Sequence, residues 1–328
     1  MIIVRLMGGL GNQLQQYALY RKLETLGKDV FLDTFWFEKD IQTSVLAPRT
    51  LELDLFENIN YRAATKEQIE AIIGSNKLVS KVWRNIQKRL LGKDKHIYES
   101  VMYEPSLFEM DDIYIEGYWA AEKYYADILN ELKKEITFDI CKTQNVEAIQ
   151  KAADDIRSSE KSCSVHIRRG DYLDPANMEL FGNIATEEYY EKAFEMIRTE
   201  FPGTRFFIFS DDPEYVLQKY GDQKDVQLID VNHGLDSRYD IYLMSLCDMH
   251  ICANSTFSFW GVRLSEGHRP MEHMSSGADQ TEPSIQKNKT PIINIRPTIQ
   301  KNTQVYDAEL MHDLWKGWTF IDPLGQLK

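Results

Sequence analysis

Two adjacent arginines follow an apolar run in the second half of the chain. The run CSVHI (163–167) has the pattern of a buried strand, and Arg168, Arg169 and Gly170 come directly after it. Ligands of doubly wound sheets bind at the carboxyl ends of strands, and a planar guanidinium suits phosphate oxygens. Because side chains alternate along a strand, we expect Arg168 to hold a phosphate and Arg169 to hold Asp171 or another carboxylate. Two structural salt bridges are the alternative.

An acidic pair occupies the same place after a second apolar run. RFFIFS (205–210) ends in Ser210, and Asp211, Asp212 and Pro213 follow. Asp212 is expected to cap the next helix, with Pro213 as the first helical residue. Asp211 is then the better candidate for a ligand contact, and a divalent metal, a base or a ribose hydroxyl would each suit a carboxylate.

A third strand-end loop is rich in hydroxyl groups. MHICA (249–253) precedes Asn254, Ser255, Thr256 and Ser258. Hydroxyls and backbone N–H groups at a helix N-terminus form an anion cradle, and an ordinary helix cap is the alternative. One basic, one acidic and one hydroxyl-rich loop in the same lobe predict a nucleotide diphosphate site. The chain has no Walker A lysine motif, so ATP hydrolysis is not indicated.

A glycine loop follows the first apolar run of the chain. The dinucleotide fingerprint G-x-G-x-x-G would use Gly9 and Gly11, with Asp33 holding a ribose. Leu14 stands where the third glycine is needed, and its side chain would obstruct close packing of helix and strand. Dinucleotide binding is therefore the runner-up interpretation of this loop.

The same loop supplies backbone that can approach a ligand at a helix N-terminus. Asn12 is expected to be the N-cap, with its amide facing either the helix or a substrate, and Gln13 follows it. A tight turn with a cap is the structural alternative.

Strand and helix patterns place these motifs in two lobes. IIVRL (2–6) and DVFLD (29–33), separated by a helical pattern that ends at Gly27, open a β-α-β unit. LELDLF (51–56) and IYIEGYW (113–119) indicate further strands. Strands and helices alternate again from about residue 145. The prediction is an α/β fold with two Rossmann-like, doubly wound domains, 1–150 and 151–328; in one variant the last helix packs back on the first domain.

Composition excludes several classes of protein. With 328 residues the chain can form two domains that each bury a core. A net charge of −13 argues against a protein that coats nucleic acid. No apolar stretch is long enough to span a bilayer, and the start lacks the features of a signal peptide. The four cysteines are scattered without metal-site spacing. We therefore expect a reduced, cytoplasmic protein without a bound metal.

Four motifs, in this order and at this spacing, resemble the bacterial α-1,2-fucosyltransferases of glycosyltransferase family 11. They are GGLGNQ (8–13), HIRRGDY (166–172), FSDD (209–212) and NSTFSFWG (254–261). YIEGYWAAEKYY (114–125) is similar to the family's middle segment. Gln15 departs from the Phe or Met usual in the family, and residues 268–290 match nothing in it.

The resemblance implies a GT-B architecture, in which two Rossmann-like domains face a cleft, with the acceptor mainly on the first and GDP-fucose mainly on the second. It implies inverting transfer of L-fucose from GDP-β-L-fucose to the 2-hydroxyl of a glycan, by default a terminal β-galactose, in surface-polysaccharide or oligosaccharide biosynthesis. No metal or other cofactor is required. By position, Arg168 is the family's phosphate-binding arginine, and Asn12 faces the reaction centre. The donor-binding residues that the motifs imply are Gly9, Gly11, Gln13, His166, Arg169, Asp171, Ser210, Asp211, Asp212, Asn254, Ser255, Thr256 and Ser258.

The acceptor hydroxyl must lose its proton as it attacks, which calls for a carboxylate or imidazole within hydrogen-bond reach. Glu116, Asp33 and His166 are candidates for this base, and an ordinary strand-end carboxylate is the alternative for Glu116. The sequence does not choose between them.

Three aromatic residues are candidates for stacking on the sugar rings of the acceptor. They are Trp36, Tyr118 and Trp119. Packing in the core is the more frequent fate of aromatic side chains and is the alternative for all three.

Residues 77–95 hold seven basic residues and one acidic residue, with apolar positions at helical spacing. A solvated surface helix is the favoured interpretation. A helix lying on the inner face of an anionic membrane, near a lipid-linked acceptor, is the alternative.

Two other functions stay open. A nicotinamide-dependent oxidoreductase would use Gly9, Gly11 and Asp33, bind NAD and not need Arg168. A non-catalytic homologue that binds a nucleotide or a glycan would bind GDP without turnover.

Overall fold

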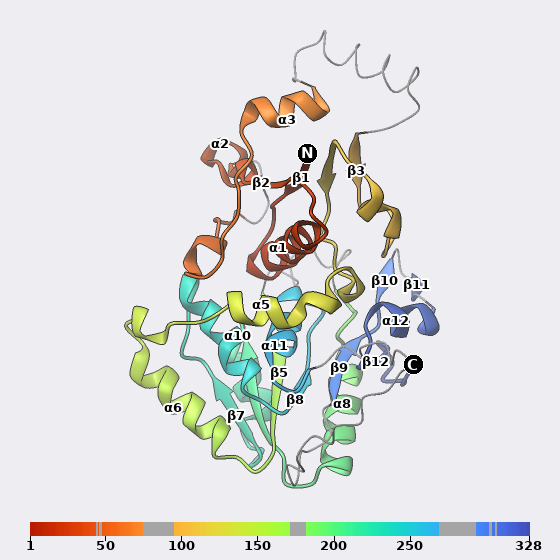
Figure 1. The fold of residues 1–328 in the computed structure, drawn as a ribbon. Helices are drawn as coiled ribbons and strands as arrows, with labels where there is room; N and C mark the ends of the chain where they lie inside the picture. Colours follow the sequence, from red (N-terminus) through yellow and green to blue (C-terminus); the bar gives the residue numbers. More distant parts are fainter. Residues whose placement is uncertain are drawn as a thin grey trace, which may run out of the picture. The chain divides into compact units, whose positions relative to one another are not determined.

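Two units of parallel α/β structure make up the chain (Figure 1). The computed structural model describes residues 1–43, 45, 48–74, 95–170, 182–268, 293–301, 304–305 and 307–328. Unit 1 is Met1–Thr137 and unit 2 is Phe138–Lys328. The predicted fold class, two Rossmann-like lobes with parallel sheets, is confirmed. The expectations for residues 77–94 and 269–290 fall outside the described residues.

Unit 1 is built on a four-stranded sheet in the order β2-β1-β4-β3, in which every pair is parallel. Its strands are β1 (Ile2–Arg5), β2 (Val30–Asp33), β3 (His96–Tyr98) and β4 (Ile113–Glu116). Its α-helices are α1 (Leu10–Thr25), α2 (Lys39–Gln42), α3 (Lys66–Ile73) and α5 (Leu129–Glu135). Because the strands are parallel, their carboxyl ends lie at one edge of the sheet, directly before the glycine loop and the GYW segment.

Helix α1 is buried on nearly all sides, including three glutamines, Gln13, Gln15 and Gln16. The helix ends as predicted. Gly27 adopts φ +74°, a left-handed conformation that glycine takes without a steric penalty. Burial of a polar amide is tolerated only when its hydrogen bonds are made. The hydrogen-bond partners of these glutamines therefore identify the segments that helix α1 holds in place.

The predicted strand at 51–56 is wrong. Residues Leu53–Leu55 form a 3-10 turn that buries Leu53, and Phe56 is also buried. Alternating leucines and acids suit a strand, but the place beside β2 is taken by a single bridge from Leu32 to Ala63. Among the described residues no strand pairs with this segment, and it turns to place its apolar residues in the core.

Unit 2 contains a six-stranded parallel sheet in the order β12-β9-β8-β5-β6-β7. Its strands are β5 (Ser162–Ile167), β6 (Arg205–Ser210), β7 (Val226–Ile229), β8 (Met249–Ile251), β9 (Asn294–Pro297) and β12 (Trp318–Ile321). Its α-helices are α6 (Val146–Arg157), α8 (Glu187–Glu200), α9 (Pro213–Tyr220), α10 (Arg238–Ser245), α11 (Thr256–Leu264) and α12 (Ala308–Leu314). A short antiparallel pair, β10 (Gln300–Lys301) and β11 (Gln304–Val305), lies outside this sheet.

Helices cover both faces of this sheet, as a doubly wound fold requires. Alternate residues of β6 enter two separate cores. Phe206 and Ile208 pack with α8 and α9, and Phe207 and Phe209 pack with α6 and α10. Burying one such side chain contributes about 1.5–3 kcal/mol, so the alternation of β6 fixes the sheet between its two helical layers.

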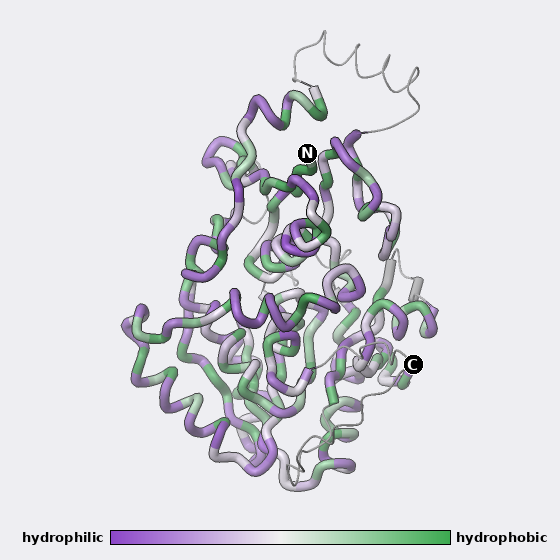
Figure 2. Tube along the Cα trace, viewed as in Figure 1, coloured by the Kyte–Doolittle hydropathy of each residue, from purple (hydrophilic) through white to green (hydrophobic). Residues whose placement is uncertain are grey.

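The unit boundary differs from the predicted one at residue 150. Ile149, Ala153 and Ile156 of α6 are buried with residues of β6, β7 and α10, so the whole helix belongs to unit 2. The hydropathy colours alternate along α6, as expected of a helix with one buried face (Figure 2). The last helix, α12, belongs to unit 2, and β12 after it extends the second sheet beside β9.

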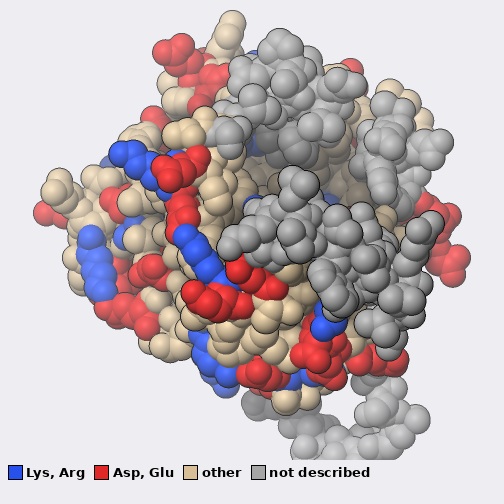
Figure 3. Space-filling view, turned by 90° about the horizontal axis from the view of Figure 1, so that it is seen from above, with Lys and Arg blue, Asp and Glu red and all other residues tan. Residues whose placement is uncertain are grey.

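Charged side chains of both signs are mixed on the face drawn in Figure 3, where Lys and Arg lie among Asp and Glu. None of the described helices is both long enough and apolar enough to cross a bilayer. The four cysteines are free thiols, and Cys163 and Cys252 are buried.

Candidate active site at two sheet edges

The basic and acidic motifs of unit 2 meet at the carboxyl edge of the second sheet. β5 and β6 are paired so that Ile167 lies opposite Ser210, which brings the residues after each strand together. Arg168 Nη1 lies 3.0 Å from Asp211 Oδ2, with about a quarter of each side chain exposed. Arg168 is thus held by a carboxylate, a pairing the sequence did not predict.

Asp211 also fixes the turn that carries the arginines. Its Oδ1 accepts a 2.8 Å hydrogen bond from the backbone N–H of Arg169. A Cβ at Gly170 would lie 2.6 Å from Asp211 Oδ2, so a larger residue here would displace the Asp211 carboxylate. The two motifs therefore form one interlocked structure, in which the Asp211 side chain, directly after β6, shapes the loop after β5.

Arg169 makes the carboxylate contact that was predicted for it, with Asp212 as the partner. Its Nε lies 3.0 Å from Asp212 Oδ2, and its guanidinium carbon lies 3.7 Å from the centre of the Tyr215 ring. Asp212 also caps α9 as predicted, accepting from the backbone N–H of Tyr215 at 3.1 Å. That hydrogen bond and Arg169 lower the pKa of Asp212. Asp171 lies outside the described residues.

His166, on β5, is buried next to Arg168. Burial lowers the pKa of His166 to about 3, and the positive charge of Arg168 adds to the effect. Its Nδ1 has no hydrogen-bond partner among the described residues. An imidazole with this pKa is a weak proton acceptor near neutral pH, so the structure disfavours His166 as the base.

The hydroxyl-rich loop leads into α11, which begins at Thr256 with Ser255 as its N-cap residue. The Ser255 side chain makes no capping hydrogen bond, so the simple helix-cap explanation does not account for this hydroxyl. Ser258 differs, because its buried hydroxyl donates to the carbonyl of Ser255 at 3.0 Å. Ser258 thus shapes the loop from inside, while Asn254, Ser255 and Thr256 stay candidates for phosphate contacts.

A second polar group lies beyond the end of β7. Asn232 Nδ2 donates to Asp240 Oδ1 at 2.7 Å, and Asp240 is the third residue of α10. Burial raises the pKa of Asp240 to about 7, although the residue keeps partial exposure. A carboxylate that is desolvated and still accessible is typical of a binding site. Sequence analysis missed it because it lies within a helix rather than directly after a strand.

The glycine loop of unit 1 differs from its prediction in one respect. Helix α1 begins at Leu10 with Gly9 as its N-cap, so Asn12 is inside the first turn and is not the N-cap. The error follows from Gly8, which adopts φ +82° and lets the helix start early. A Cβ at Gly8 would lie 2.6 Å from Asn12 Nδ2, so the Asn12 amide packs directly on the loop.

Buried glutamines bind the loop to the rest of unit 1. Gln13 Nε2 donates to the carbonyls of Gly8 and Thr50, and its Oε1 accepts from the backbone N–H of Glu52. Gln16 accepts from the N–H of Met7 and donates to the carbonyl of Gly117. Both amide hydrogens of Gln13 are therefore used within the protein, which favours a supporting role over the predicted donor contact.

Charged side chains line the carboxyl edge of the first sheet. Arg5 Nη1 lies 2.7 Å from Glu116 Oε1, and His96 Nε2 lies 2.9 Å from Glu116 Oε2. The His96 hydrogen bond and the charge of Arg5 hold the pKa of Glu116 below its usual value. Asp33 is buried and accepts from the Tyr114 hydroxyl at 2.5 Å and from the Phe35 N–H at 2.8 Å. Both candidate carboxylates are thus engaged, which weakens the case for either as the direct base.

The predicted role of Trp119 in stacking on a sugar is wrong in this structure. Its ring is 1% exposed and meets Tyr124 edge-on at 5.7 Å. Glu99 accepts from the N–H groups of both Tyr118 and Trp119, and the GYW loop turns at Trp119, where φ is +53°. Tyr118 is 44% exposed and stays a candidate for stacking on the acceptor.

Trp36 lies in the 3-10 turn Phe35–Phe37 directly after β2. Its ring packs edge-on against Phe37 at 5.0 Å. Trp36 is partly exposed, so it stays a candidate for stacking on a sugar ring of the acceptor.

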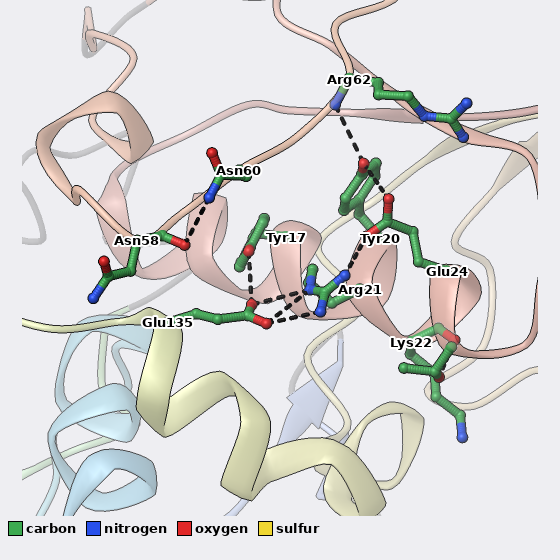
Figure 4. A network of polar contacts seen from close by, with 10 residues as sticks. Tyr17, Tyr20, Arg21, Lys22, Glu24, Asn58, Asn60, Arg62 and Glu135 are labelled. Carbon is green, nitrogen blue, oxygen red and sulfur yellow. Dashed lines mark hydrogen bonds and ion pairs between the residues drawn. The ribbon is translucent and has the colours of Figure 1, made fainter.

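A polar cavity of about 360 Å³ lies in unit 1, and no residue of the strand-end motifs lines it. Figure 4 shows the polar network formed by residues of its lining. Arg21 binds both oxygens of Glu135 and also pairs with Glu24, and the Tyr17 hydroxyl donates to Glu135 at 2.7 Å. These groups satisfy one another, so the network indicates a structural link between α1 and α5. Among the described residues, no cluster of three His, Cys, Asp or Glu side chains suits a metal ion.

Comparison with known proteins gives one family. The model of "Glycosyl transferase family 11" matches residues 58–270, a span that starts after the glycine loop and includes all three strand-end motifs of unit 2. An Escherichia coli α-1,2-colitosyltransferase is 29% identical over 281 residues, which cover 80% of this chain and 87% of that protein. An O-antigen biosynthesis glycosyltransferase of the same species is 29% identical over 282 residues, which cover 79% of this chain and 89% of that protein. A crystal structure of an α-1,6-fucosyltransferase soaked with GDP-fucose matches with a TM-score of 0.42 at 12% identity, over 80% of this chain and 92% of that one.

Proposed function

Because the chain belongs to glycosyltransferase family 11, we propose that it transfers L-fucose from GDP-β-L-fucose to the 2-hydroxyl of a glycan, with inversion at the anomeric carbon. The observation that carries the proposal is the Arg168–Asp211 arrangement at the carboxyl edge of the second sheet. A terminal β-galactose is the proposed acceptor. The matches to family 11 do not favour the oxidoreductase interpretation, and Leu14 replaces a glycine that a dinucleotide would need.

Colitose is a second candidate for the transferred sugar. The E. coli relative named as an α-1,2-colitosyltransferase matches most of this chain, and it supports colitose as strongly as the motifs support fucose. Colitose lacks the 3-hydroxyl of fucose, so a site for one requires little change to admit the other. A GDP-activated donor is common to both proposals.

In the proposed mechanism, Arg168 stabilises the leaving group. Breaking the bond from the sugar to GDP leaves negative charge on the β-phosphate. A guanidinium already oriented by Asp211, with N–H groups at the start of α11, can meet that charge without reorganising. Donors of this kind contribute about 3–4 kcal/mol each to lowering a barrier. These groups supply the stabilisation that a metal ion provides in other transferases.

Asp240 is the proposed contact for the guanine base. Guanine presents two N–H donors on one edge, and an ionised carboxylate accepts both. Asp240 is desolvated, partly exposed and oriented by Asn232, which suits it to that task. This assignment predicts a preference for GDP over ADP, conferred by a residue that touches neither phosphate nor sugar.

Thermal unfolding with added nucleotide tests the donor site, because a ligand that binds only the folded protein raises the midpoint. We expect GDP to stabilise the wild type more than GMP or NAD does. In the Arg168→Ala variant, GDP should raise the unfolding midpoint no more than GMP does. Arg205→Ala, which removes an exposed arginine at the opposite end of β6, is the matched control and should keep the difference between GDP and GMP. Stabilisation by NAD and not by GDP would contradict the proposal.

A further inference from the structure

A chain of hydrogen bonds links β3 to the last residues of β4 and β1 in the first sheet. The Tyr98 hydroxyl lies 3.1 Å from His96 Nδ1, and His96 Nε2 lies 2.9 Å from Glu116 Oε2. Arg5 Nη1 binds the other oxygen of Glu116 at 2.7 Å. The chain therefore links a phenol, an imidazole, a carboxylate and a guanidinium across three adjacent strands.

The partners determine the direction of each hydrogen bond. Glu116, kept ionised beside Arg5, can only accept, so His96 Nε2 carries the hydrogen. A neutral imidazole then has its lone pair on Nδ1, and the Tyr98 hydroxyl must donate to it. The arrangement is thus ordered to pass a proton from Tyr98 toward Glu116.

Packing holds the imidazole in this orientation. The rings of His96 and Tyr98 are stacked with centroids 4.0 Å apart, and the Tyr114 ring meets His96 edge-on at 4.9 Å. Exposure decreases along the chain, since Tyr98 is 58% exposed and the His96 side chain 21%. The phenol is therefore the member of the chain that a substrate can reach.

We propose that Tyr98, His96 and Glu116 form a proton relay that activates the acceptor hydroxyl; this rests on the proposed function. The acceptor oxygen bonds to the anomeric carbon, whose bond to the phosphate oxygen breaks with its electron pair leaving on GDP. The acceptor proton moves to the Tyr98 oxygen as the phenol proton moves to His96 Nδ1. The imidazolium so formed is stabilised by Glu116, and returns its proton to solvent after the product leaves.

The relay assigns different roles to its members. Tyr98 is the catalytic residue that touches the acceptor, and His96 is the group on which the proton rests. Glu116 is a positioning residue, which replaces its predicted role as the direct base. Sequence analysis missed His96 and Tyr98 because β3 has only three residues and no motif around it.

Turnover of the Tyr98→Phe variant tests the relay. The substitution removes one exposed hydroxyl and keeps the stacked ring. We expect kcat to fall by about 10²-fold or more, with little change in the KM for the donor. Tyr61→Phe, which removes a hydroxyl from unit 1 at a distance from the strand-end motifs, is the matched control and should keep the wild-type kcat. A Tyr98→Phe enzyme with a kcat within about threefold of the wild type would overturn the relay.

A spectroscopic readout separates the relay from the proposed function. ¹⁵N NMR should show His96 as the Nε2–H tautomer, its signal assigned by its loss in His96→Gln. The Nδ1–H tautomer would overturn the relay whether or not turnover is found. A wild type that binds GDP and transfers no sugar would contradict the proposed function, and with it the relay. An active wild type with an equally active Tyr98→Phe variant contradicts the relay alone.

Discussion

At the scale of single residues, the chemistry lies in pairs of side chains that fix each other. Arg168 is oriented by Asp211, Arg169 by Asp212, and Asp240 by Asn232. The sequence places both arginines and both aspartates directly after apolar runs, and it predicted a carboxylate partner for Arg169 but not the pairing of Arg168 with Asp211. The role of Asp240 could not be predicted, since nothing in the sequence around it shows that Asn232 lies within hydrogen-bond distance.

The pKa of Asp240 leads to a prediction for nucleotide binding. Burial raises this pKa to about 7, so the carboxylate is ionised above that pH and protonated below it. A protonated carboxyl loses an acceptor for the guanine N–H groups, and GDP affinity should therefore weaken as the pH falls below about 7. Asp240→Asn should weaken GDP binding about tenfold or more at pH 8 and remove this part of the pH dependence. Calorimetric titration between pH 5.5 and 8.5 would measure it.

Two comparisons isolate the effect of the carboxylate. ADP carries the same phosphates as GDP but no guanine. Its affinity should therefore change with pH only through the titration of the phosphates. Asp222→Asn, at an exposed position, should bind GDP like the wild type. Equal GDP affinity of the wild type and Asp240→Asn at pH 8 would show that Asp240 does not contact the base.

At the scale of elements, the parallel sheets explain why the motifs converge. Short apolar runs predicted most strands, and Gly27 marked the end of α1. The segment 51–56 alternates like a strand, but no strand in the described part of the chain pairs with it. Pairing partners cannot be inferred from a local pattern. The start of α1 was misplaced because Gly8 allows a turn that a capping preference for Asn12 does not reveal.

The network between α1 and α5 gives a prediction about stability (Figure 4). Glu135 accepts from Tyr17 and binds the guanidinium of Arg21, with only 19% of its side chain exposed. Glu135→Gln should lower the free energy of unfolding by about 1–3 kcal/mol, because Arg21 loses one of its two charged partners and keeps only Glu24. Chemical denaturation would measure the change.

The matched control for this network is Glu195→Gln, which removes an exposed pair with Lys192. It should change the free energy of unfolding by less than about 0.5 kcal/mol. GDP binding should be unaffected in both variants if the cavity is structural. Loss of GDP binding in Glu135→Gln without loss of stability would show instead that the cavity binds a ligand.

At the scale of the whole molecule, two similar sheets carry different chemistry at equivalent edges. In unit 2 the edge offers a guanidinium, hydroxyls and a helix N-terminus, which suit a nucleotide diphosphate. In unit 1 the edge offers Tyr98, His96 and Glu116, which suit a hydroxyl that must lose a proton. These residue types support the proposed division, with the donor on unit 2 beside Arg168 and the acceptor on unit 1 beside His96.

The central claim is transfer of a 6-deoxy sugar from a GDP donor to a 2-hydroxyl. The most direct test incubates the protein with a β-galactoside and either GDP-fucose or GDP-colitose, and determines the product linkage by NMR. We predict an α-linked sugar on the 2-hydroxyl of galactose from at least one donor, and no product with Arg168→Ala. GDP binding without product from either donor, or a product linked to another hydroxyl, would contradict the account.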